Sequence, residues 1–206
     1  MRITGGSLRS RQLQAPRGPA TRPTSDRVRE ALFGILHSAG VLSGAHVLDL
    51  YAGTGALSLE ALSRGADRAT LVESSREALA ALRANVAALG QERQTRIVAG
   101  DVRARATAAR LAQDVATLAR PFDLVFADPP WALVAEGQPQ AVLSVLAQSG
   151  GLSDHATVVL EHASRSAPPD IEALVRGETR KYGDTALTFY KPAILAPLLE
   201  ERPTSE

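Results

Sequence analysis

The sequence predicts an α/β fold built on a doubly wound, mainly parallel sheet that a C-terminal antiparallel hairpin closes. Short apolar segments of strand length alternate with helical patterns, and this alternation is typical of parallel sheets with right-handed crossovers. Near the C-terminus, two strand-like segments flank Gly183-Asp184, a dipeptide that favours a hairpin turn. With 206 residues, the chain is long enough for one well-buried domain and a small extension.

The first predicted helix begins after Thr24 or Ser25, either of which can cap it. Its apolar positions, from Val28 to Leu36, recur at helical spacing, and Asp26 lies in the first turn, where a negative charge is favourable. The helix ends near Gly40. Further helices are expected over 57–63, 75–89, 103–119 and 140–149.

Five buried strands are expected, because each is a short apolar run bounded by glycine, proline or charged residues. They are His46–Leu50, Ala69–Glu73, Arg96–Ala99, Pro121–Ala127 and Ala156–Glu161. Two further strands, Glu178–Tyr182 and Ala186–Pro192, form the hairpin.

Composition excludes several classes of protein. With 45% hydrophobic and 22% charged residues, the chain resembles an ordinary globular protein and neither a disordered nor a collagen-like one. It has no apolar run near the ~18 residues that a membrane helix needs. The absence of cysteine excludes disulfides and thiolate metal sites, which fits a reducing compartment, and a cytoplasmic location is expected.

Basic residues are concentrated at the N-terminus, although the net charge of the whole chain is only +1. Residues 1–25 contain five arginines and no acidic residue. We therefore expect a basic N-terminal arm over residues 1–23, followed by the main domain over 24–206. Such clustering suggests contact with RNA phosphates, the alternative being a solvated surface arm. The candidate RNA-binding residues are Arg2, Arg9, Arg11, Arg17 and Arg22, with Arg27 and Arg29 of the first helix added, although these two can instead pair with Asp26 or Glu30.

Ligands of doubly wound sheets bind at the carboxyl ends of the strands, so the residues that follow each strand are candidates. The first strand is followed by Gly53-Thr-Gly55, a turn that lets a ligand approach the backbone closely. A dinucleotide-binding fingerprint would have a third glycine where Ser58 stands, which argues against NAD. Glu73 follows the second strand and can accept hydrogen bonds from a ribose diol, while Asp101 follows the third and can bind an adenine amine. Taken singly, Glu73 could be a solvated acid and Asp101 the N-cap of a helix that begins near Val102.

The fourth strand is followed by Asp128-Pro129-Pro130-Trp131, the most specific motif in the sequence. Prolines have no N–H and fix φ, so the segment is stiff and presents carbonyl oxygens beside a carboxylate and an indole face. This set suits a planar heterocycle that carries an exocyclic amine. The alternative is a rigid turn with Trp131 packed in the core.

These motifs resemble those of methyltransferases that use S-adenosylmethionine and act on exocyclic amines of bases. More narrowly, the chain is similar to the RsmD family, which methylates N2 of one guanine in bacterial 16S ribosomal RNA. The resemblance covers nearly the whole chain, with Trp131 standing where the family usually has Phe or Tyr. The segments that carry it are Arg2–Gly6, Arg9–Arg11, Arg22–Glu30, Asp49–Leu57, Glu60–Gly65 and Tyr182–Thr185.

The resemblance implies a Rossmann-like class I methyltransferase fold with a mainly parallel seven-stranded sheet. It implies S-adenosylmethionine as cofactor, no metal, no membrane, and 16S ribosomal RNA as partner, within an assembling small subunit. The expected catalytic segment is Asp128, Pro129, Pro130 and Trp131. The expected cofactor-binding residues are Asp49, Tyr51, Ala52, Gly53, Gly55, Glu73, Ser74, Asp101 and Val102.

Three alternatives remain open from the residues. An adenine-N6 DNA methyltransferase would use the same pocket chemistry. A non-catalytic RNA-binding assembly factor could keep the fold, although intact Asp128 and the glycine turn argue against it. A nicotinamide oxidoreductase is disfavoured by Ser58 and by the Asp-Pro-Pro-Trp segment.

Overall fold

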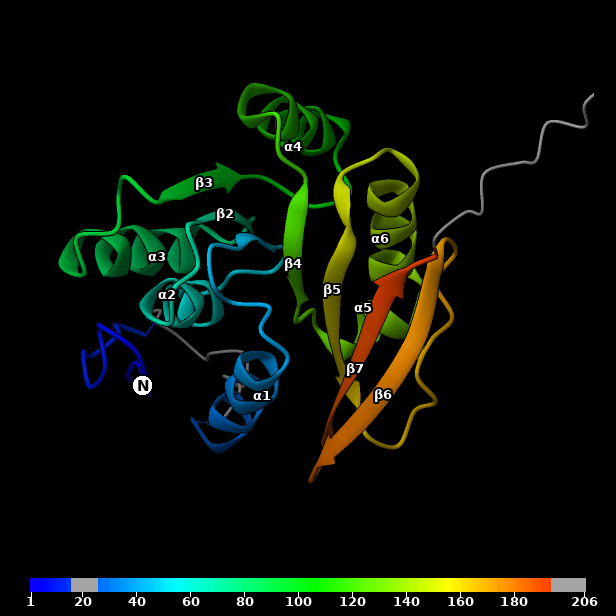
Figure 1. Cartoon of the computed structure of the whole chain (residues 1–206), viewed down its shortest axis with the longest axis horizontal. Coiled ribbons are helices and arrows are strands. Elements are labelled where there is room, and N and C mark those ends of the chain that lie inside the picture. The colour runs from blue at the N-terminus through cyan, green and yellow to red at the C-terminus, as the bar shows by residue number, and fades with distance from the viewer. Residues whose placement is uncertain (16–25, 194–206) are drawn as a thin grey trace, which may run out of the picture.

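The computed structural model describes residues 1–15 and 26–193, which form one seven-stranded sheet with helices on both faces (Figure 1). The strand order is β3-β2-β1-β4-β5-β7-β6. The first five strands are parallel, and β7 pairs antiparallel with both β5 and β6. The strands are β1 (His46–Asp49), β2 (Arg68–Glu73), β3 (Thr95–Ala99), β4 (Phe122–Ala127), β5 (Leu152–Ala163), β6 (Leu174–Tyr182) and β7 (Thr185–Pro192).

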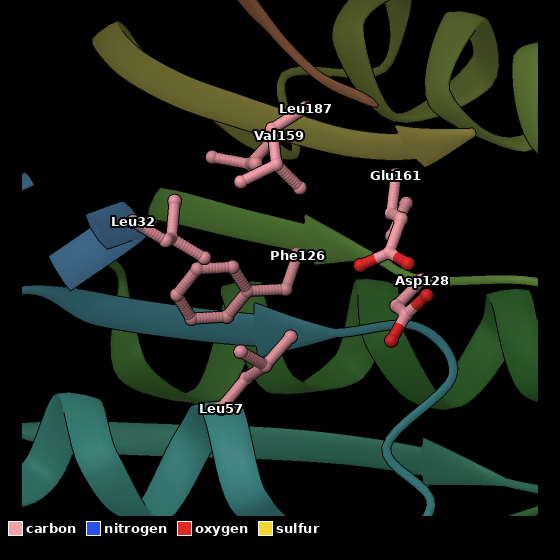
Figure 2. A pocket seen from close by; sticks show the side chains of 8 residues that line it. Leu32, Leu57, Phe126, Asp128, Val159, Glu161 and Leu187 are labelled. Carbon is pink, nitrogen blue, oxygen red and sulfur yellow. The ribbon is translucent and has the colours of Figure 1, made fainter. Parts of the chain in front are cut away.

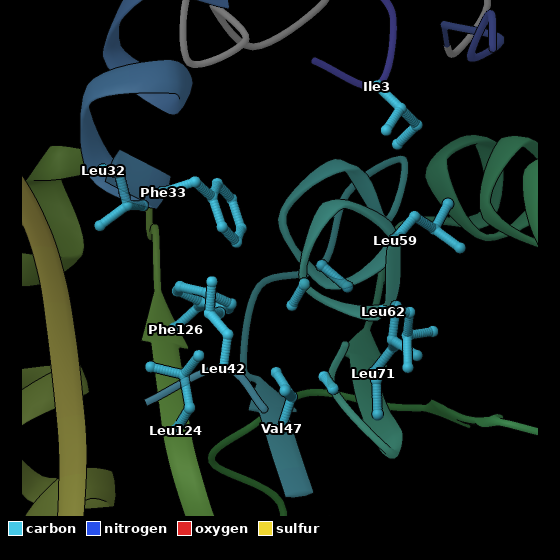
Figure 3. Packing of buried hydrophobic residues seen from close by; sticks show 14 of the residues in the cluster. Ile3, Leu32, Phe33, Leu42, Val47, Leu59, Leu62, Leu71, Leu124 and Phe126 are labelled. Carbon is cyan, nitrogen blue, oxygen red and sulfur yellow. The ribbon is translucent and has the colours of Figure 1, made fainter. Parts of the chain in front are cut away.

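The helices divide into two layers because successive strand residues point to opposite faces of the sheet. Val47 and Leu124 belong to a core cluster with the apolar side chains of α1, α2 and α3 (Figure 3), whereas Leu48 and Val125 pack with α4 and α6. The central strands β1, β2 and β4 are therefore buried on both faces, as predicted. The prediction of a buried strand is wrong for β3, an edge strand in which only Val98 is buried. The helices are α1 (Asp26–Ser38), α2 (Ala56–Ser63), α3 (Arg76–Ala88), α4 (Arg105–Leu118), α5 (Trp131–Ala135) and α6 (Gln138–Gln148).

The strand order reverses between β1 and β4, which are neighbours although two strands and three helices separate them in sequence. At such a switch point the loops after the two strands turn in opposite directions and leave a crevice at the carboxyl ends. Asp49 ends β1, and Asp128 directly follows β4. The topology thus brings together two acids that are far apart in the sequence.

The prediction of a separate basic arm is wrong for the residues that the structure describes. Ile3 and Leu13 are buried in the core cluster, and Arg2 forms an isolated antiparallel bridge with Gln12. Residues 1–14, which we call the N-terminal strap, therefore belong to the domain. Residues 16–23 of the predicted arm lie outside the described residues.

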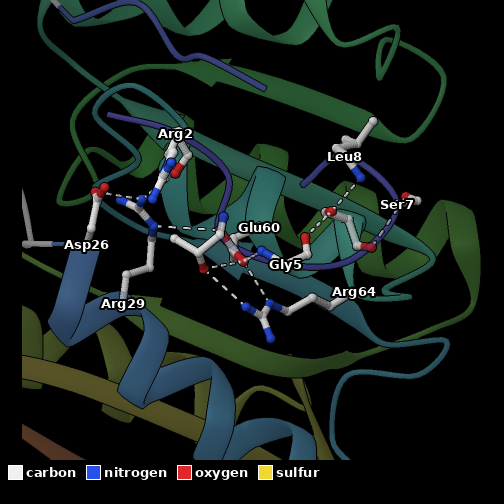
Figure 4. A network of polar contacts seen from close by, with 10 residues as sticks. Arg2, Gly5, Ser7, Leu8, Asp26, Arg29, Glu60 and Arg64 are labelled. Carbon is white, nitrogen blue, oxygen red and sulfur yellow. Dashed lines mark hydrogen bonds and ion pairs between the residues drawn. The ribbon is translucent and has the colours of Figure 1, made fainter. Parts of the chain in front are cut away.

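The strap is fastened to α2 by Glu60, which is fully buried (Figure 4). The carboxylate of Glu60 accepts hydrogen bonds from the backbone N–H of Thr4 at 2.7 Å and of Gly5 at 2.8 Å. It also accepts the hydroxyl of Thr4 and Nε of Arg64. The charge pattern alone could not predict this arrangement, because the partners that hold the segment, among them Glu60, Ser63 and Asn85, are distant in the sequence.

The short helix α5 was not predicted, because its five residues are too few for a periodic pattern. It begins at Trp131, directly after Pro130, whose backbone occupies the N-cap position. The predicted helix boundary near Val102 is also wrong: α4 begins at Arg105, so Asp101 does not cap it. The other predicted elements are present, and β5 and β6 extend by several residues beyond their expected ends.

Candidate active site

A cleft of about 1240 Å³ opens at the carboxyl ends of β1, β2, β3 and β4. That volume exceeds what one drug-sized ligand needs, so there is space for a cofactor and part of a second molecule. All predicted cofactor-binding and catalytic residues line it, with Gly55 as the single exception. The strap reaches it too, since Met1 is among the lining residues.

Asp49 lies at the base of the cleft and is almost completely buried. Its Oδ2 accepts a 2.9 Å hydrogen bond from the hydroxyl of Ser58, while Oδ1 has no hydrogen-bond partner among the described residues. Burial raises the pKa of Asp49 to about 7, with smaller contributions from the negative charges of Asp128 and Glu73. A buried carboxylate with an unused oxygen is suited to a cationic ligand.

The turn after β1 requires glycine at two positions. Gly53 and Gly55 have φ angles of 55° and 81°, and a Cβ on Gly55 would come within 2.5 Å of Leu82 Cδ1. Gly55 does not line the cleft; its role in the structure is to allow α2 to pack against α3 and β2. The backbone N–H of Gly53 donates to Oε2 of Glu73 at 2.8 Å, which joins the two loops.

Glu73 is positioned by three backbone N–H groups. Besides Gly53 on Oε2, its Oε1 accepts the N–H groups of Ser74 and Ser75 at 2.8 and 2.7 Å. Because an ionised carboxylate can accept about four hydrogen bonds, capacity remains for a ligand hydroxyl. The rigid placement favours recognition over a solvated surface role.

Asp101 and Val102 form the far wall of the cleft, after β3. The Asp101 carboxylate accepts the backbone N–H and the guanidinium of Arg103, and these contacts lower the pKa of Asp101 to about 2. Asp101 is thus ionised and available as an acceptor at the rim. Tyr51 lies nearby, and its buried hydroxyl has no partner within the described chain.

The Asp128-Pro129-Pro130-Trp131 segment forms the opposite wall. Pro129 is buried, and Trp131 is 37% exposed at the start of α5, so the core-packed alternative for the indole is excluded. The carboxylate of Asp128 lies on the same cleft as that of Asp49 and close enough to raise its pKa. The segment therefore contributes an acid, two prolines and an indole to the wall of one cleft.

The sequence reasoning missed Glu161, although it ends the fifth predicted strand. A small, mainly apolar cavity is lined by Leu32, Phe126 and Val159, and Asp128 and Glu161 line one side of it (Figure 2). Both acids also line the main cleft. The signal that could have found Glu161 is the one that identified the others, an acid at the carboxyl end of a parallel strand.

The predicted RNA-binding arginines separate into three groups. Arg2, Arg9, Arg11 and Arg27 are exposed. Arg29 is fully buried, and its guanidinium donates to the carbonyl oxygen of Arg2 and to Asp26 while lying 3.7 Å from Glu60. Its assignment to RNA contact is therefore wrong, because a buried charge must be paired inside the protein. Arg17 and Arg22 lie outside the described residues.

Two features are absent from residues 1–15 and 26–193. No cluster of three or more potential metal ligands occurs there. No helix in the same ranges is long and apolar enough to cross a membrane.

Comparison with known proteins agrees with this geometry. A family model described as "Conserved hypothetical protein 95" matches residues 1–191. Ribosomal RNA small subunit methyltransferase D of Escherichia coli K12 is 38% identical over 173 residues, which are 84% of this chain and 80% of the relative. A solved structure of a hypothetical protein from Thermus thermophilus is 32% identical, with a TM-score of 0.71 over 92% of this chain and 98% of that one.

More distant structures show the same fold. An RNA methyltransferase from Salinibacter ruber, solved in complex with S-adenosyl-L-homocysteine, superposes with a TM-score of 0.55 at 18% identity over 89% of this chain and 98% of that one. The predicted class I methyltransferase fold is thereby confirmed, and the Salinibacter protein binds S-adenosyl-L-homocysteine, the demethylated form of S-adenosylmethionine. Asp49 with its unused buried oxygen, and the acids after β2 and β3, fit that cofactor. From the match over nearly its whole length, the chain belongs to the RsmD family of ribosomal RNA methyltransferases.

Proposed function

We propose that this protein methylates the exocyclic N2 amine of one guanine in 16S ribosomal RNA, in the cytoplasm and within an assembling small subunit. The observation that carries the proposal is the Asp128 to Trp131 segment, which presents an amine acceptor and a stacking face to the cleft that holds the cofactor-binding acids. The curated Escherichia coli relative is named as a methyltransferase of small-subunit ribosomal RNA, which supports the RNA class.

Each predicted cofactor residue has a role in this proposal. Asp49 would bind the ammonium group of the methionyl portion, beside the backbone of Tyr51, Ala52 and Gly53. Glu73 would accept the ribose hydroxyls next to Ser74, and Asp101 with Val102 would bind the adenine. When bound, the sulfonium supplies an electrophilic methyl group, so the protein has chiefly to position the nucleophile.

The guanine amine is a weak nucleophile because its lone pair is delocalised into the ring. Hydrogen bonds from its two hydrogens to Asp128 and to the carbonyl oxygen of Pro129 would favour a pyramidal nitrogen and release that pair. Asp128 also stabilises the positive charge that develops on nitrogen and can accept the proton afterwards. Trp131 would stack on the base, and the ~1 to 3 kcal/mol of such stacking would offset the cost of removing it from its own stack.

The test is nucleoside mapping by mass spectrometry of ribosomal RNA from cells with and without the gene. We expect one N2-methylguanosine in the small-subunit RNA to disappear on deletion and to return when the purified protein and S-adenosylmethionine are added. The DNA of the same cells is mapped in parallel, and loss of N6-methyldeoxyadenosine from it would instead establish the adenine alternative. An unchanged set of methylated nucleosides, with no methyl transfer in vitro, would overturn the proposal.

A further inference from the structure

We infer that Glu161 selects guanine over the other bases that carry an exocyclic amine, by accepting the N–H of the ring nitrogen next to that amine. The inference rests on the proposed function and concerns a residue to which that function assigns no role. It starts from the neighbouring positions of Glu161 and Asp128.

Strand pairing places these two acids side by side. Ala127 at the end of β4 is in register with Leu160 of β5. Asp128 and Glu161 are the next residue on each side, so they lie next to each other just beyond the last β4–β5 pair. Their side chains face the same space, beyond Phe126 and Val159 toward the carboxyl ends of β4 and β5 (Figure 2). A base whose amine is held by Asp128 can therefore be oriented with the ring nitrogen beside that amine toward Glu161, and this is the orientation that we infer.

The surroundings of Glu161 favour a ligand that donates a hydrogen bond to its carboxylate. The residue is only 8% exposed, and its Oε1 accepts a 3.4 Å hydrogen bond from the hydroxyl of Thr185. Thr185 begins β7 directly after the Gly183-Asp184 turn, and this turn also lines the cleft. The Tyr182–Thr185 segment singled out in the sequence thus forms the side of the base pocket that holds Glu161. A carboxylate so shielded from water strongly favours a partner that donates a hydrogen bond.

Only guanine supplies that donor. Its N1–H lies next to the carbon that bears the N2 amine, so two neighbouring donors meet two neighbouring carboxylates. Adenine and cytosine carry an unprotonated ring nitrogen at the corresponding place, and its lone pair would face the Glu161 carboxylate without a hydrogen. A flipped base is commonly read through hydrogen bonds along its Watson–Crick edge, and a site built for a donor rejects the analogue that lacks it.

The test uses small-subunit RNA with 2-aminopurine in place of the mapped guanine, because 2-aminopurine keeps the amine and lacks the N1 hydrogen. For the wild-type protein we expect kcat/KM to fall by about 10- to 100-fold on this RNA, as for one lost hydrogen bond to a charged group. In Glu161→Gln the discrimination should shrink to within a few-fold, because the amide can donate to the bare N1. Glu172→Gln, which removes an exposed acid outside the cleft, should keep the wild-type ratio.

Binding of both RNAs, followed by 2-aminopurine fluorescence and by competition with the guanine RNA in the presence of S-adenosyl-L-homocysteine, gives the same ratio without turnover. It decides the question even if Glu161→Gln is inactive. If Glu161 had a purely structural role, Glu161→Gln would weaken the binding of both RNAs equally. An unchanged ratio of the two affinities in Glu161→Gln would therefore overturn the inference, while the proposed guanine methylation would stand. If the wild-type protein forms no N2-methylguanosine, the proposed function and this inference fall together.

Discussion

The hydroxyl of Ser58 donates a 2.9 Å hydrogen bond to Oδ2 of Asp49, and both side chains are buried. Ser58 stands where a dinucleotide-binding turn would have its third glycine. Here the position holds a hydrogen-bond donor for the acid at the base of the cleft. This hydrogen bond lowers the pKa of Asp49, but burial raises it by more. The net pKa of Asp49 is about 7.

The first prediction concerns the pH dependence of cofactor affinity. A cationic ammonium bound to Asp49 favours the ionised carboxylate, so affinity for S-adenosylmethionine should rise from about pH 5.5 to about pH 7, by at most about tenfold per pH unit. Above about pH 7 the amino group of the cofactor itself begins to lose its proton, which limits the useful range. Titration calorimetry across this range measures the effect.

Two variants check this interpretation. Ser58→Ala removes a contact that lowers the pKa of Asp49, so the rise in affinity should move to higher pH. Asp49→Asn should bind weakly and with little dependence on pH in the same range. A rise that persists unchanged in Asp49→Asn would assign the titration to another group.

The second prediction separates binding from catalysis at Asp128. Asp128→Ala should lower kcat by roughly 100-fold or more, because the amine loses its charged acceptor. Affinity for S-adenosylmethionine should stay within a few-fold. It should even rise slightly near neutral pH, since the negative charge of Asp128 raises the pKa of Asp49. Single-turnover kinetics with calorimetry tests both halves, and a parallel loss of cofactor binding would place Asp128 in the cofactor site.

The third prediction uses the single tryptophan of the chain. Trp131 is partly exposed on the cleft, so its fluorescence should be quenched when a base stacks on it. Trp131→Phe should keep substantial activity because a flat ring remains. Trp131→Ala should weaken productive RNA binding by ~1 to 3 kcal/mol. Normal turnover by Trp131→Ala would remove the stacking role.

The sequence predicted the acids of the cleft better than it predicted which N-terminal arginines are exposed. Strand-end positions follow from a simple alternation of elements, so Asp49, Glu73, Asp101 and Asp128 were expected to meet, and all four line one cleft. Glu161 obeys the same rule but lacks a neighbouring motif. Its strand-end position is the one sequence signal that marks it, and its place beside Asp128 follows only from the pairing of β4 with β5.

Arg29 illustrates what periodicity cannot supply. It follows Val28 in a helix whose apolar positions alone indicate the buried face, and a charged residue beside that face is normally exposed. Its burial depends on Glu60 and on the strap, which fold over it from distant parts of the sequence. Such pairing of charges across the fold has no signature in local spacing.

The fourth prediction follows from that pairing. Glu60→Ala leaves the buried guanidinium of Arg29 with Asp26 as its one remaining carboxylate partner among the described residues, and it removes the acceptor for Thr4 and Gly5. We expect the free energy of unfolding to fall by about 3 to 5 kcal/mol in urea titration. Glu92→Ala, at an exposed acid, should change it by less than about 0.5 kcal/mol. A loss for Glu60→Ala as small as that of the control would mean that the strap is held by its apolar contacts alone.

The last prediction concerns RNA binding by the strap. Because Ile3 and Leu13 are part of the core, deleting the strap would damage the fold, so the charges must be tested by substitution. Arg2, Arg9 and Arg11 are exposed, although the guanidinium of Arg11 also donates to the carbonyl oxygen of Ala88. Each phosphate contact steepens the dependence of log affinity on log salt by ~0.7 to 0.9 through counterion release.

Replacing these three arginines by glutamine should therefore flatten the salt dependence of binding to small-subunit RNA by about two to three units. Affinity for S-adenosylmethionine should not change, which separates a lost RNA contact from a disturbed fold. The matched control is Arg110→Gln on α4, an exposed arginine whose helix covers the other face of the sheet. If the triple variant keeps the wild-type slope, the strap is a structural element only, and the phosphates are bound by other cations of the domain.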